Sequence, residues 1–592
     1  MAFLACLGVW SFLTPVCAWA DEPKAIIRGV DNEDLRDRIE RAVGRSEKPS
    51  ESRFQARRRA NEAAEDVVTV LRSEGYYDYE VTPEVTGTDP PKAVVRVVAG
   101  PRYRFSMVGL EWLRPPEGEV AKAAALKAVD LRDGQAGRAA EVVAAEGRVV
   151  AALSKRGYPD AKAGDRKVIV DHADQTVQPT FRIDAGPLVR LDGIQLETTG
   201  RTNPRWVNRL APWRVGDVYD PDDVAELERR LLDTGVYDSV TVALAPAEKT
   251  DAQGRRPIIV SLADRPRATI EVGAGYSTSE GAGLDVVYNR YNRFGRADTL
   301  TGILRLAQIQ QRLGLSLALP HWRRPAQTLT LSTEAFQELT EAYDRAGVNL
   351  RADIRQRLGK TSFYNYGASI EFAREQELAK DPVTGVRPLE RDLAILTGVA
   401  GLSLDRSNDP LDPTRGWRVS GDLQPTVVAG STGITFLRVQ AQGSAYLPLD
   451  KQARTVVAGR LRLGTILNGA IPDVPSDRRF YAGGGGSVRG YEYQGIGPRL
   501  PNGSPQGGLS LAEMSIEARR QLFGNWGVAV FLDGGAVSAN PTPDFSNARL
   551  GAGFGVRYRL PFAPIRADVA FPLDKSNGQP SFQVYVSIGQ AF

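Results

Sequence analysis

A run of glycines followed by a lone arginine is the part of the sequence best suited to hold a charged group. Four successive glycines occupy Gly483–Gly486, and Arg489 follows in a unit with Val488, Gly490 and Tyr491. Successive glycines allow backbone angles and close approaches that other residues do not. A flexible loop with one guanidinium can grip a phosphate, or it can insert the cation among fixed carboxylates. The loop by itself leaves both alternatives open.

Other residues that could carry chemistry are sparse. The only histidines, His172 and His321, are far apart in the sequence, and no G-x-S-x-G occurs. Residues 359–361 imitate the end of a phosphate loop, but Ile354 stands where that motif needs glycine. The sequence therefore predicts no enzyme, no metal site and no cofactor, although a buried pair of carboxylates acting as acid and base stays open.

The composition indicates an exported protein of several domains. With 592 residues the chain is too long for one ordinary domain, and 75 Lys and Arg against 71 Asp and Glu give no electrostatic case for nucleic acid. Residues 1–20 are apolar, without a charged side chain, and end in Ala-Trp-Ala, which predicts a signal peptide; a membrane-anchoring helix is the alternative. Cys6 and Cys17 both lie in it, so the mature chain has no cysteine.

The front half contains a repeat of about eighty residues. A helical stretch ends in glycine followed within two residues by an aromatic at Gly75, Gly157 and Gly235, which are 82 and 78 residues apart. Glycine after the last helical turn is a helix stop. Each unit reads strand, helix, helix, strand, strand, so we expect three small α+β modules. Their predicted ranges are 24–99, 100–186 and 187–265.

After residue 267 the pattern changes to alternation. Ile270, Val272, Ala274 and Tyr276 share one face of a predicted strand, and polar or small residues share the other. This alternation is typical of a transmembrane β-barrel, and about sixteen strands fit into residues 267–592. A soluble β-sandwich or propeller is the alternative.

The barrel must close between its first and last strands. We expect these strands at about 268–280 and 582–592, with Phe592 ending the last one. Gly273, Gly275 and Gly589 lie near this predicted seam, where glycine weakens a strand and permits local distortion.

A second dense motif comes before residue 417. Asp412, Pro413, Thr414, Arg415 and Gly416 end a segment rich in Asp, Asn and Pro, which predicts an ordered turn. Three acids in this segment give a calcium site as the alternative.

Taken in order, the three modules, this turn, the Val-Arg-Gly-Tyr loop and the terminal phenylalanine resemble a known family. The modules resemble polypeptide-transport-associated (POTRA) repeats. The whole chain resembles the outer-membrane β-barrel assembly family that includes BamA, TamA and the two-partner secretion transporters. Three modules before the barrel are most similar to TamA. The resemblance implies an outer-membrane barrel with its modules in the periplasm.

The resemblance also implies a place for Arg489. In this family the loop folds back into the barrel, where its arginine meets acidic residues on strands just downstream. Glu517 and Asp533 are the candidates here, and each is out of phase with an apolar neighbour, so both can face the interior. Arginine forms forked, charge-assisted bonds with carboxylates. Whether such an anchor is a latch or a moving part stays open.

The function implied is insertion of other β-barrel proteins, autotransporters included, into the outer membrane. Clients would add strands to module edges and to the barrel seam. A TamB-like inner-membrane-anchored protein and outer-membrane lipids are the implied partners. A two-partner-secretion-type export pore and a TamA-like role in phospholipid transport are the alternatives.

Overall fold

A computed structural model describes residues 22–592 apart from 47, 278–280, 341, 378–388, 502, 562 and 576–579. The predicted signal peptide, 1–20, lies outside these described residues, as do the last three residues of the predicted first barrel strand. No described helix is both long enough and apolar enough to cross a membrane.

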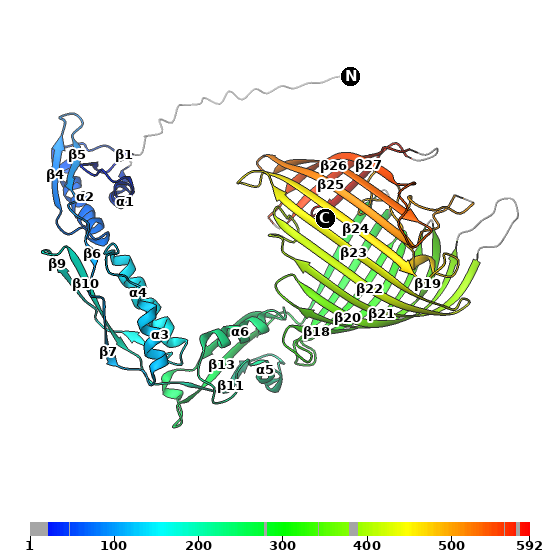
Figure 1. The fold of residues 1–592 in the computed structure, drawn as a ribbon, viewed down its shortest axis with the longest axis horizontal. Helices are drawn as coiled ribbons and strands as arrows, with labels where there is room; N and C mark the ends of the chain where they lie inside the picture. The colour runs from blue at the N-terminus through cyan, green and yellow to red at the C-terminus, as the bar shows by residue number, and fades with distance from the viewer. Residues whose placement is uncertain are drawn as a thin grey trace, which may run out of the picture. The chain divides into compact units, whose positions relative to one another are not determined.

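The first module is a three-stranded sheet covered by two helices (Figure 1). Its elements are β1 (Glu22–Pro23), β2 (Ile26–Arg28), α1 (Glu33–Val43), β3 (Arg45–Ser46), α2 (Arg53–Ser73), β4 (Glu80–Thr86) and β5 (Lys92–Val98). The strands lie in the order β2-β5-β4, so β4 is an edge strand. Asn32 and Ser52 cap the two helices by accepting hydrogen bonds from Leu35 and Gln55 backbone N–H groups.

The next two modules repeat this plan. The second comprises β6 (Arg104–Phe105), β7 (Gly109–Arg114), α3 (Glu119–Val129), α4 (Ala139–Ser154), β8 (Lys162–Ala163), β9 (Lys167–Asp171) and β10 (Thr176–Asp184). The third comprises β11 (Arg190–Thr198), α5 (Pro204–Leu210), α6 (Pro221–Leu232), β12 (Tyr237–Leu244), the 3-10 turn η1 (Ala247–Lys249) and β13 (Arg255–Asp264). Gly75, Gly157 and Gly235 have φ angles of 90°, 94° and 70°, as expected for glycines that end helices.

An ion pair joins segments of the second and third modules. Arg256, which is buried, donates to both carboxylate oxygens of Asp160 at 3.0 and 2.6 Å. These hydrogen bonds from Arg256 outweigh partial burial and lower the pKa of Asp160. The carboxylate therefore stays charged under periplasmic conditions, and the pair holds at ordinary pH.

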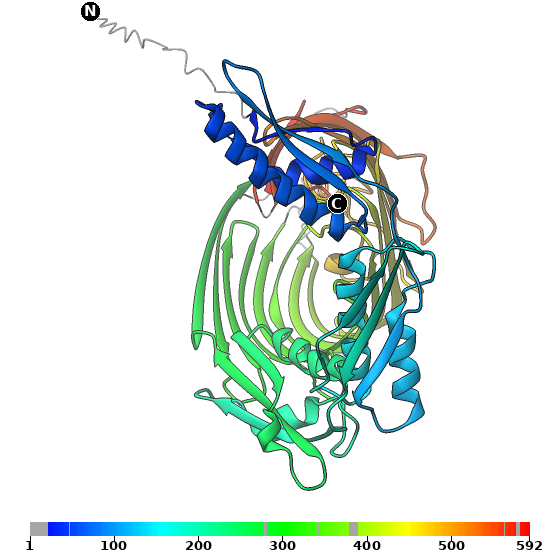
Figure 2. The same ribbon diagram turned by 90° about the vertical axis from the view of Figure 1, so that its left-hand side faces the viewer.

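The rest of the chain is one antiparallel sheet that curls into a barrel (Figures 1 and 2). Its sixteen described strands are β14 (Ala268–Ser277), β15 (Gly281–Tyr291), β16 (Thr299–Ala307), β17 (Gln310–Leu319), β18 (Gln327–Leu339), β19 (Tyr343–Arg357), β20 (Phe363–Glu377), β21 (Leu389–Asp405), β22 (Gly416–Gly430), β23 (Ile434–Pro448), β24 (Thr455–Leu467), β25 (Ser510–Phe523), β26 (Trp526–Ser538), β27 (Arg549–Arg559), β28 (Pro564–Pro572) and β29 (Gln583–Ile588). Each strand pairs with the next in sequence.

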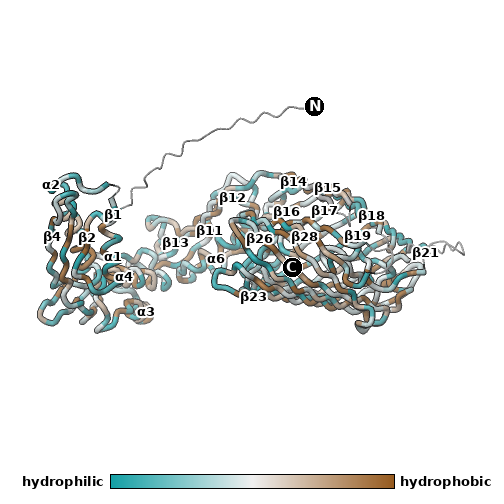
Figure 3. Tube along the Cα trace, turned by 90° about the horizontal axis from the view of Figure 1, so that it is seen from above, coloured by the Kyte–Doolittle hydropathy of each residue, from teal (hydrophilic) through white to brown (hydrophobic). Residues whose placement is uncertain are grey.

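Alternation decides which side chains face inward. Along β25, Met514 and Ile516 are exposed on the outer surface, while Ser515 and Glu517 are buried inside. The hydropathy tube in Figure 3 shows apolar and polar positions interleaved around the barrel. A lipid-facing apolar surface and a polar interior are what a membrane barrel requires.

The last strand is shorter than the sequence pattern predicts. We expected it to run over 582–592, but β29 ends at Ile588. Gly589 adopts a φ of 87° and turns the chain, and the Gln590 N–H then donates to the Leu411 carbonyl oxygen at 3.1 Å. Phe592 therefore does not end a strand; its ring packs against a buried cluster of Tyr446, Val456 and Ala458.

Candidate functional site: an arginine held by carboxylates inside the barrel

The loop between β24 and β25, residues 468–509, carries Arg489 into a buried ionic network. The guanidinium binds Asp533 with two hydrogen bonds, Nε to Oδ2 at 2.7 Å and Nη2 to Oδ1 at 3.0 Å. Its Nη1 donates to Glu517 at 2.8 Å, and the backbone N–H of Arg489 donates to Asp533 at 3.1 Å. The structure thus brings together the three residues predicted as the loop anchor.

The two predicted acids reach the guanidinium because alternation points them inward. Glu517 lies on β25 and Asp533 on β26, and both side chains are fully buried. A third carboxylate, Asp568 on β28, lies 3.3 Å from Arg489 Nη1 and is also fully buried. Sequence reasoning missed Asp568, although an acid in phase with other inward residues of an alternating strand is a signal that could have found it.

Three further arginines surround the carboxylates. Arg519 donates to Glu517 at 2.7 Å, Arg557 donates to Asp568 at 2.5 Å, and Arg566 lies 3.3 Å from Asp568. Four buried cations therefore share three buried anions. Because unpaired buried charges are costly, each member of such a network stabilises the others' burial.

Close packing fixes the loop around Arg489. The guanidinium carbon lies 3.3 Å from the centre of the Phe531 ring, a cation–π contact. A Cβ added to Gly551 on β27 would lie 2.0 Å from the carbonyl oxygen of Arg489. Gly490, with φ of 99°, would place a Cβ 2.8 Å from the backbone of Phe571. Only glycine fits at these two positions.

The other residues of the Val-Arg-Gly-Tyr unit complete the packing. Val488 and Tyr491 are buried, and the Tyr491 hydroxyl donates to the Leu550 carbonyl oxygen at 2.9 Å. Tyr585 on β29 accepts from the Gly490 N–H and donates to the Tyr491 carbonyl oxygen, both at 3.2 Å. The loop thus contacts the last strand of the sheet. Carboxylates accept hydrogen bonds from all three guanidinium nitrogens of Arg489. Of the two alternatives for the loop, a phosphate grip or a cation inserted among fixed carboxylates, the structure has the second.

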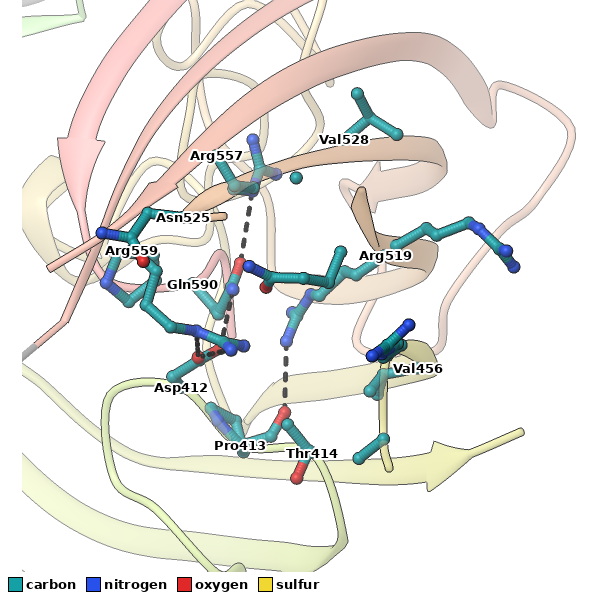
Figure 4. A pocket seen from close by; sticks show the side chains of 16 residues that line it. Asp412, Pro413, Thr414, Val456, Arg519, Asn525, Val528, Arg557, Arg559 and Gln590 are labelled. Atoms are coloured by element: carbon teal, nitrogen blue, oxygen red, sulfur yellow. Dashed lines mark hydrogen bonds and ion pairs between the residues drawn. The ribbon is translucent and has the colours of Figure 1, made fainter. Parts of the chain in front are cut away.

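The predicted turn before β22 lies beside a pocket at one end of the barrel (Figure 4). Thr414 and Arg415 donate backbone hydrogen bonds to Asn408 Oδ1 at 3.0 and 2.9 Å, and Gly416 has a φ of 100°. No group of three or more His, Cys, Asp or Glu that could hold a metal ion occurs among the described residues. Backbone N–H groups of the segment donate to Asp405 and Asp409, whereas side chains from elsewhere bind Asp412.

Both the C-terminal residues and β27 contact this turn. Arg559 lies 3.0 Å from the Asp412 carboxylate, and Gln590 donates to it at 2.9 Å. Arg519 approaches the Pro413 carbonyl oxygen at 3.4 Å. Figure 4 shows Asp412, Arg559 and Gln590 converging at one side of the pocket. The turn therefore holds the segment that follows β29.

The two ends of the sheet differ from every other strand. Among the described residues, each strand from β15 to β28 pairs on both sides, whereas β14 and β29 have one partner each. Gly273 and Gly275 lie within β14, and Gly589 lies just past β29. Ile270 and Val272 on β14 are 69% and 68% exposed.

Comparison with known proteins identifies the relatives of this chain. Residues 292–592 match the Omp85 superfamily domain, and residues 25–99 match the POTRA domain described as TamA domain 1. Outer membrane protein assembly factor BamA of Neorickettsia risticii is 23% identical over 530 residues, 86% of this chain and 69% of that protein. The same factor of Neisseria meningitidis serogroup B is 21% identical over 589 residues, 89% of this chain and 72% of that protein.

A solved structure shares the fold. The crystal structure of BamA from Haemophilus ducreyi lacking POTRA domains 1-3 superposes with a TM-score of 0.69 at 19% identity, covering 82% of this chain and all of that one. The barrel therefore lies in the outer membrane, and the N-terminal POTRA domain lies in the periplasm. The family match covers just over half of the chain, and the chain belongs to the Omp85 superfamily.

Proposed function

We propose that this chain assembles β-barrel proteins, autotransporters included, into the outer membrane by templating client strands at its seam. The observation that carries this proposal is that β14 and β29 end the sheet, and that β14 has one strand partner among the described residues. Unpaired backbone N–H and C=O groups are costly in a membrane. A client strand that pairs with β14 satisfies them, so the seam favours strand addition.

The periplasmic modules offer a second place for an extended client. In the first module β4 is an edge strand of seven residues, with backbone groups free to pair on one side. Edge strands accept extended peptides through main-chain hydrogen bonds. The second and third modules share the strand-helix-helix-strand-strand order, and we assign them to the POTRA class on that ground. The assembly role named for the BamA relatives supports this proposal.

Cysteine crosslinking tests the seam directly. The sequence contains only Cys6 and Cys17, so a single engineered cysteine reports its own position after both are changed to serine. Val272→Cys on β14 is the seam probe, and Val530→Cys on β26 is its matched control, since both side chains are exposed. A client with a cysteine in its last strand is expected to crosslink to the seam probe alone. Equal crosslinking of both, or of neither, contradicts the proposal.

Depletion of the chain followed by outer-membrane proteomics distinguishes the assembly function from the two alternatives, a secretion pore and phospholipid transport. Selective loss of autotransporters and other barrels supports assembly. Loss of a single secreted protein instead favours a two-partner-secretion-type pore. Altered outer-membrane phospholipid with unchanged barrel levels favours a role in phospholipid transport.

The similarity of the first module to a TamA-type POTRA domain supports a TamB-like partner. Such an inner-membrane-anchored protein would dock on the periplasmic modules. Affinity purification of the full chain from crosslinked cells is expected to recover it. A module-deleted chain that recovers it equally well would contradict docking at the modules.

A further inference from the structure

The front of the 468–509 loop is bound to the barrel wall at a place well separated in sheet order from Arg489. The short 3-10 turn η2, Ser476–Arg478, lies against β19 and β20. Asp477 accepts a hydrogen bond from Arg345 on β19, and Arg345 also bonds to Glu371 on β20. Arg478 of the loop donates to the same Glu371 at 3.0 Å. Two loop charges and two wall charges thus form one network.

A second set of contacts lies four residues further along β20, at Glu375, and on its neighbour β21. The backbone N–H of Ser476 donates to both oxygens of Glu375 on β20, at 3.2 and 3.1 Å. Arg391 on β21 donates to Glu375 at 2.5 Å and to the Pro472 carbonyl oxygen at 2.8 Å. The wall therefore holds the loop backbone as well as its charged side chains.

Burial makes these contacts costly to break. Arg345, Glu371, Glu375 and Arg391 are all buried, and the Asp477 side chain is 6% exposed. Separation of loop from wall would part Asp477 from Arg345 and Arg478 from Glu371, and would take the Ser476 N–H away from Glu375, which keeps Arg391. A buried charge that loses its partner destabilises the arrangement strongly.

The contacts of η2 and those of Arg489 share no residue. At Arg489 the loop supplies a cation to acids on β25, β26 and β28. At η2 it supplies an acid, a cation and a backbone N–H to β19 and β20, and the Ser476 hydroxyl accepts from Arg391 on β21. Strands β22 to β24 lie between the two wall segments. Two separate ionic sites therefore hold the two parts of one loop.

We infer that Ser476–Arg478, with Arg345, Glu371, Glu375 and Arg391, is a second anchor that positions the front of the loop independently of Arg489. When the Arg489 contacts break, the region around Val488 keeps the weaker hydrogen bonds from Arg460 and Tyr585 and opens more often, while η2 stays on the wall. The loop then moves as a flap hinged at η2 and is not expelled from the barrel. This inference does not depend on the assembly function.

Two reporter cysteines distinguish the parts of the loop. Val474 lies next to η2 and Val488 next to Arg489, and both side chains are fully buried. Val474→Cys and Val488→Cys are placed singly in the full chain with Cys6 and Cys17 changed to serine, reconstituted in lipid vesicles. The rate of labelling by a water-soluble maleimide then measures how often each part opens.

Each anchor is weakened by its own variant. Arg489→Gln is expected to speed labelling at Val488→Cys at least about tenfold, equivalent to about 1.4 kcal/mol in the opening equilibrium, with little change at Val474→Cys. The pair Asp477→Asn and Arg478→Gln removes one charge of each sign from the loop and leaves Arg345 bonded to Glu371. It is expected to speed labelling at Val474→Cys by a similar factor, with little change at Val488→Cys.

Arg374→Gln is the control on the same wall. Arg374 pairs with Asp392 on β20 and β21, but both side chains are 71% exposed, so neither labelling rate is expected to change. If Arg489→Gln alone speeds labelling at both reporters equally, the loop has one cooperative anchor and the inference is wrong. It is also wrong if the loop pair leaves Val474→Cys as slow as before. Heat-modifiable migration on gels checks that each variant retains its barrel, and Arg478→Gln alone replaces the pair if the pair does not fold.

Discussion

The wall formed by β25–β28 and the seam between β14 and β29 are held in different ways. In the wall, every strand pairs on both sides, and a network of seven buried charged side chains, six from these strands and one from the loop, adds bonds inside the barrel. They are Arg489, Glu517, Arg519, Asp533, Arg557, Arg566 and Asp568. At the seam, β14 and the six-residue β29 each pair on one side among the described residues. The wall has far more specific contacts than closure of a sheet needs, and the seam has fewer.

The two regions meet at Tyr585. This residue belongs to β29 at the seam, yet its hydroxyl bonds to the backbone of Gly490 and Tyr491 in the loop. The loop in turn is held by Arg489 on the wall. The last strand is therefore supported from the inside of the barrel. The last strand and the anchored loop are thus parts of one arrangement.

The largest expected effect comes from removing the loop's cation from the wall. Arg489→Ala leaves Asp533 without its forked partner, and is expected to lower the free energy of unfolding by about 3–5 kcal/mol. Urea unfolding of the full chain in lipid vesicles measures it. Arg489→Lys keeps the charge but loses the planar fork, so its loss is expected to be smaller.

Arg489→Ala and Arg489→Lys together can contradict the view that the wall is held more tightly than the seam. If Ala and Lys both cost less than about 1 kcal/mol, the value of an exposed ion pair, the wall network contributes little and the wall is no better held than the seam. If both cost the same large amount, the geometry of the guanidinium matters and its charge does not.

A smaller effect is expected where the loop backbone touches the wall. Gly551→Ala puts a methyl group against the Arg489 carbonyl oxygen, and overpacking of this kind costs about 1–3 kcal/mol. Gly443→Ala on β23 is the control, because no atom lies within 4 Å of its added Cβ. The same urea titration compares them. Equal midpoints for the two variants would show that the loop shifts freely and is not tightly seated.

Alternation made part of this site predictable from sequence. Glu517 and Asp533 could be placed inward because each follows an apolar neighbour that faces lipid. The contacts of Asp477 could not be predicted, since an irregular loop has no period that relates its residues to strands far away in the chain. The end of β29 was misplaced because alternation continues to Phe592, while the turn at Gly589 is set by contacts with Leu411.

Hydrogen exchange compares the opening of seam strands and wall strands in the chain without a substitution. Amide protons of β14 and β29 are expected to exchange at least about tenfold faster than those of β26, because edge strands open more easily. A tenfold difference corresponds to about 1.4 kcal/mol in the free energy of local opening. Exchange mass spectrometry of the chain in lipid gives both rates at once. Equal protection of β14 and β26 would mean that the seam is closed by a partner in the membrane.

The smallest expected effect on the free energy of unfolding concerns Phe592, which lies beyond the end of β29. The Phe592 ring lies 5.6 Å from the guanidinium carbon of Arg519 on β25 and 5.4 Å from that of Arg460 on the neighbouring β24, and both arginines are buried. Phe592→Ala removes these cation–π contacts, each worth about 0.5–1 kcal/mol at accessible sites, so a loss of about 1–2 kcal/mol is expected in the urea titration. Phe582→Ala is the matched control, because its ring is 54% exposed. A loss as large for Phe582→Ala would show that the terminal ring is not held by the wall, and that the last residues belong with the loosely held seam.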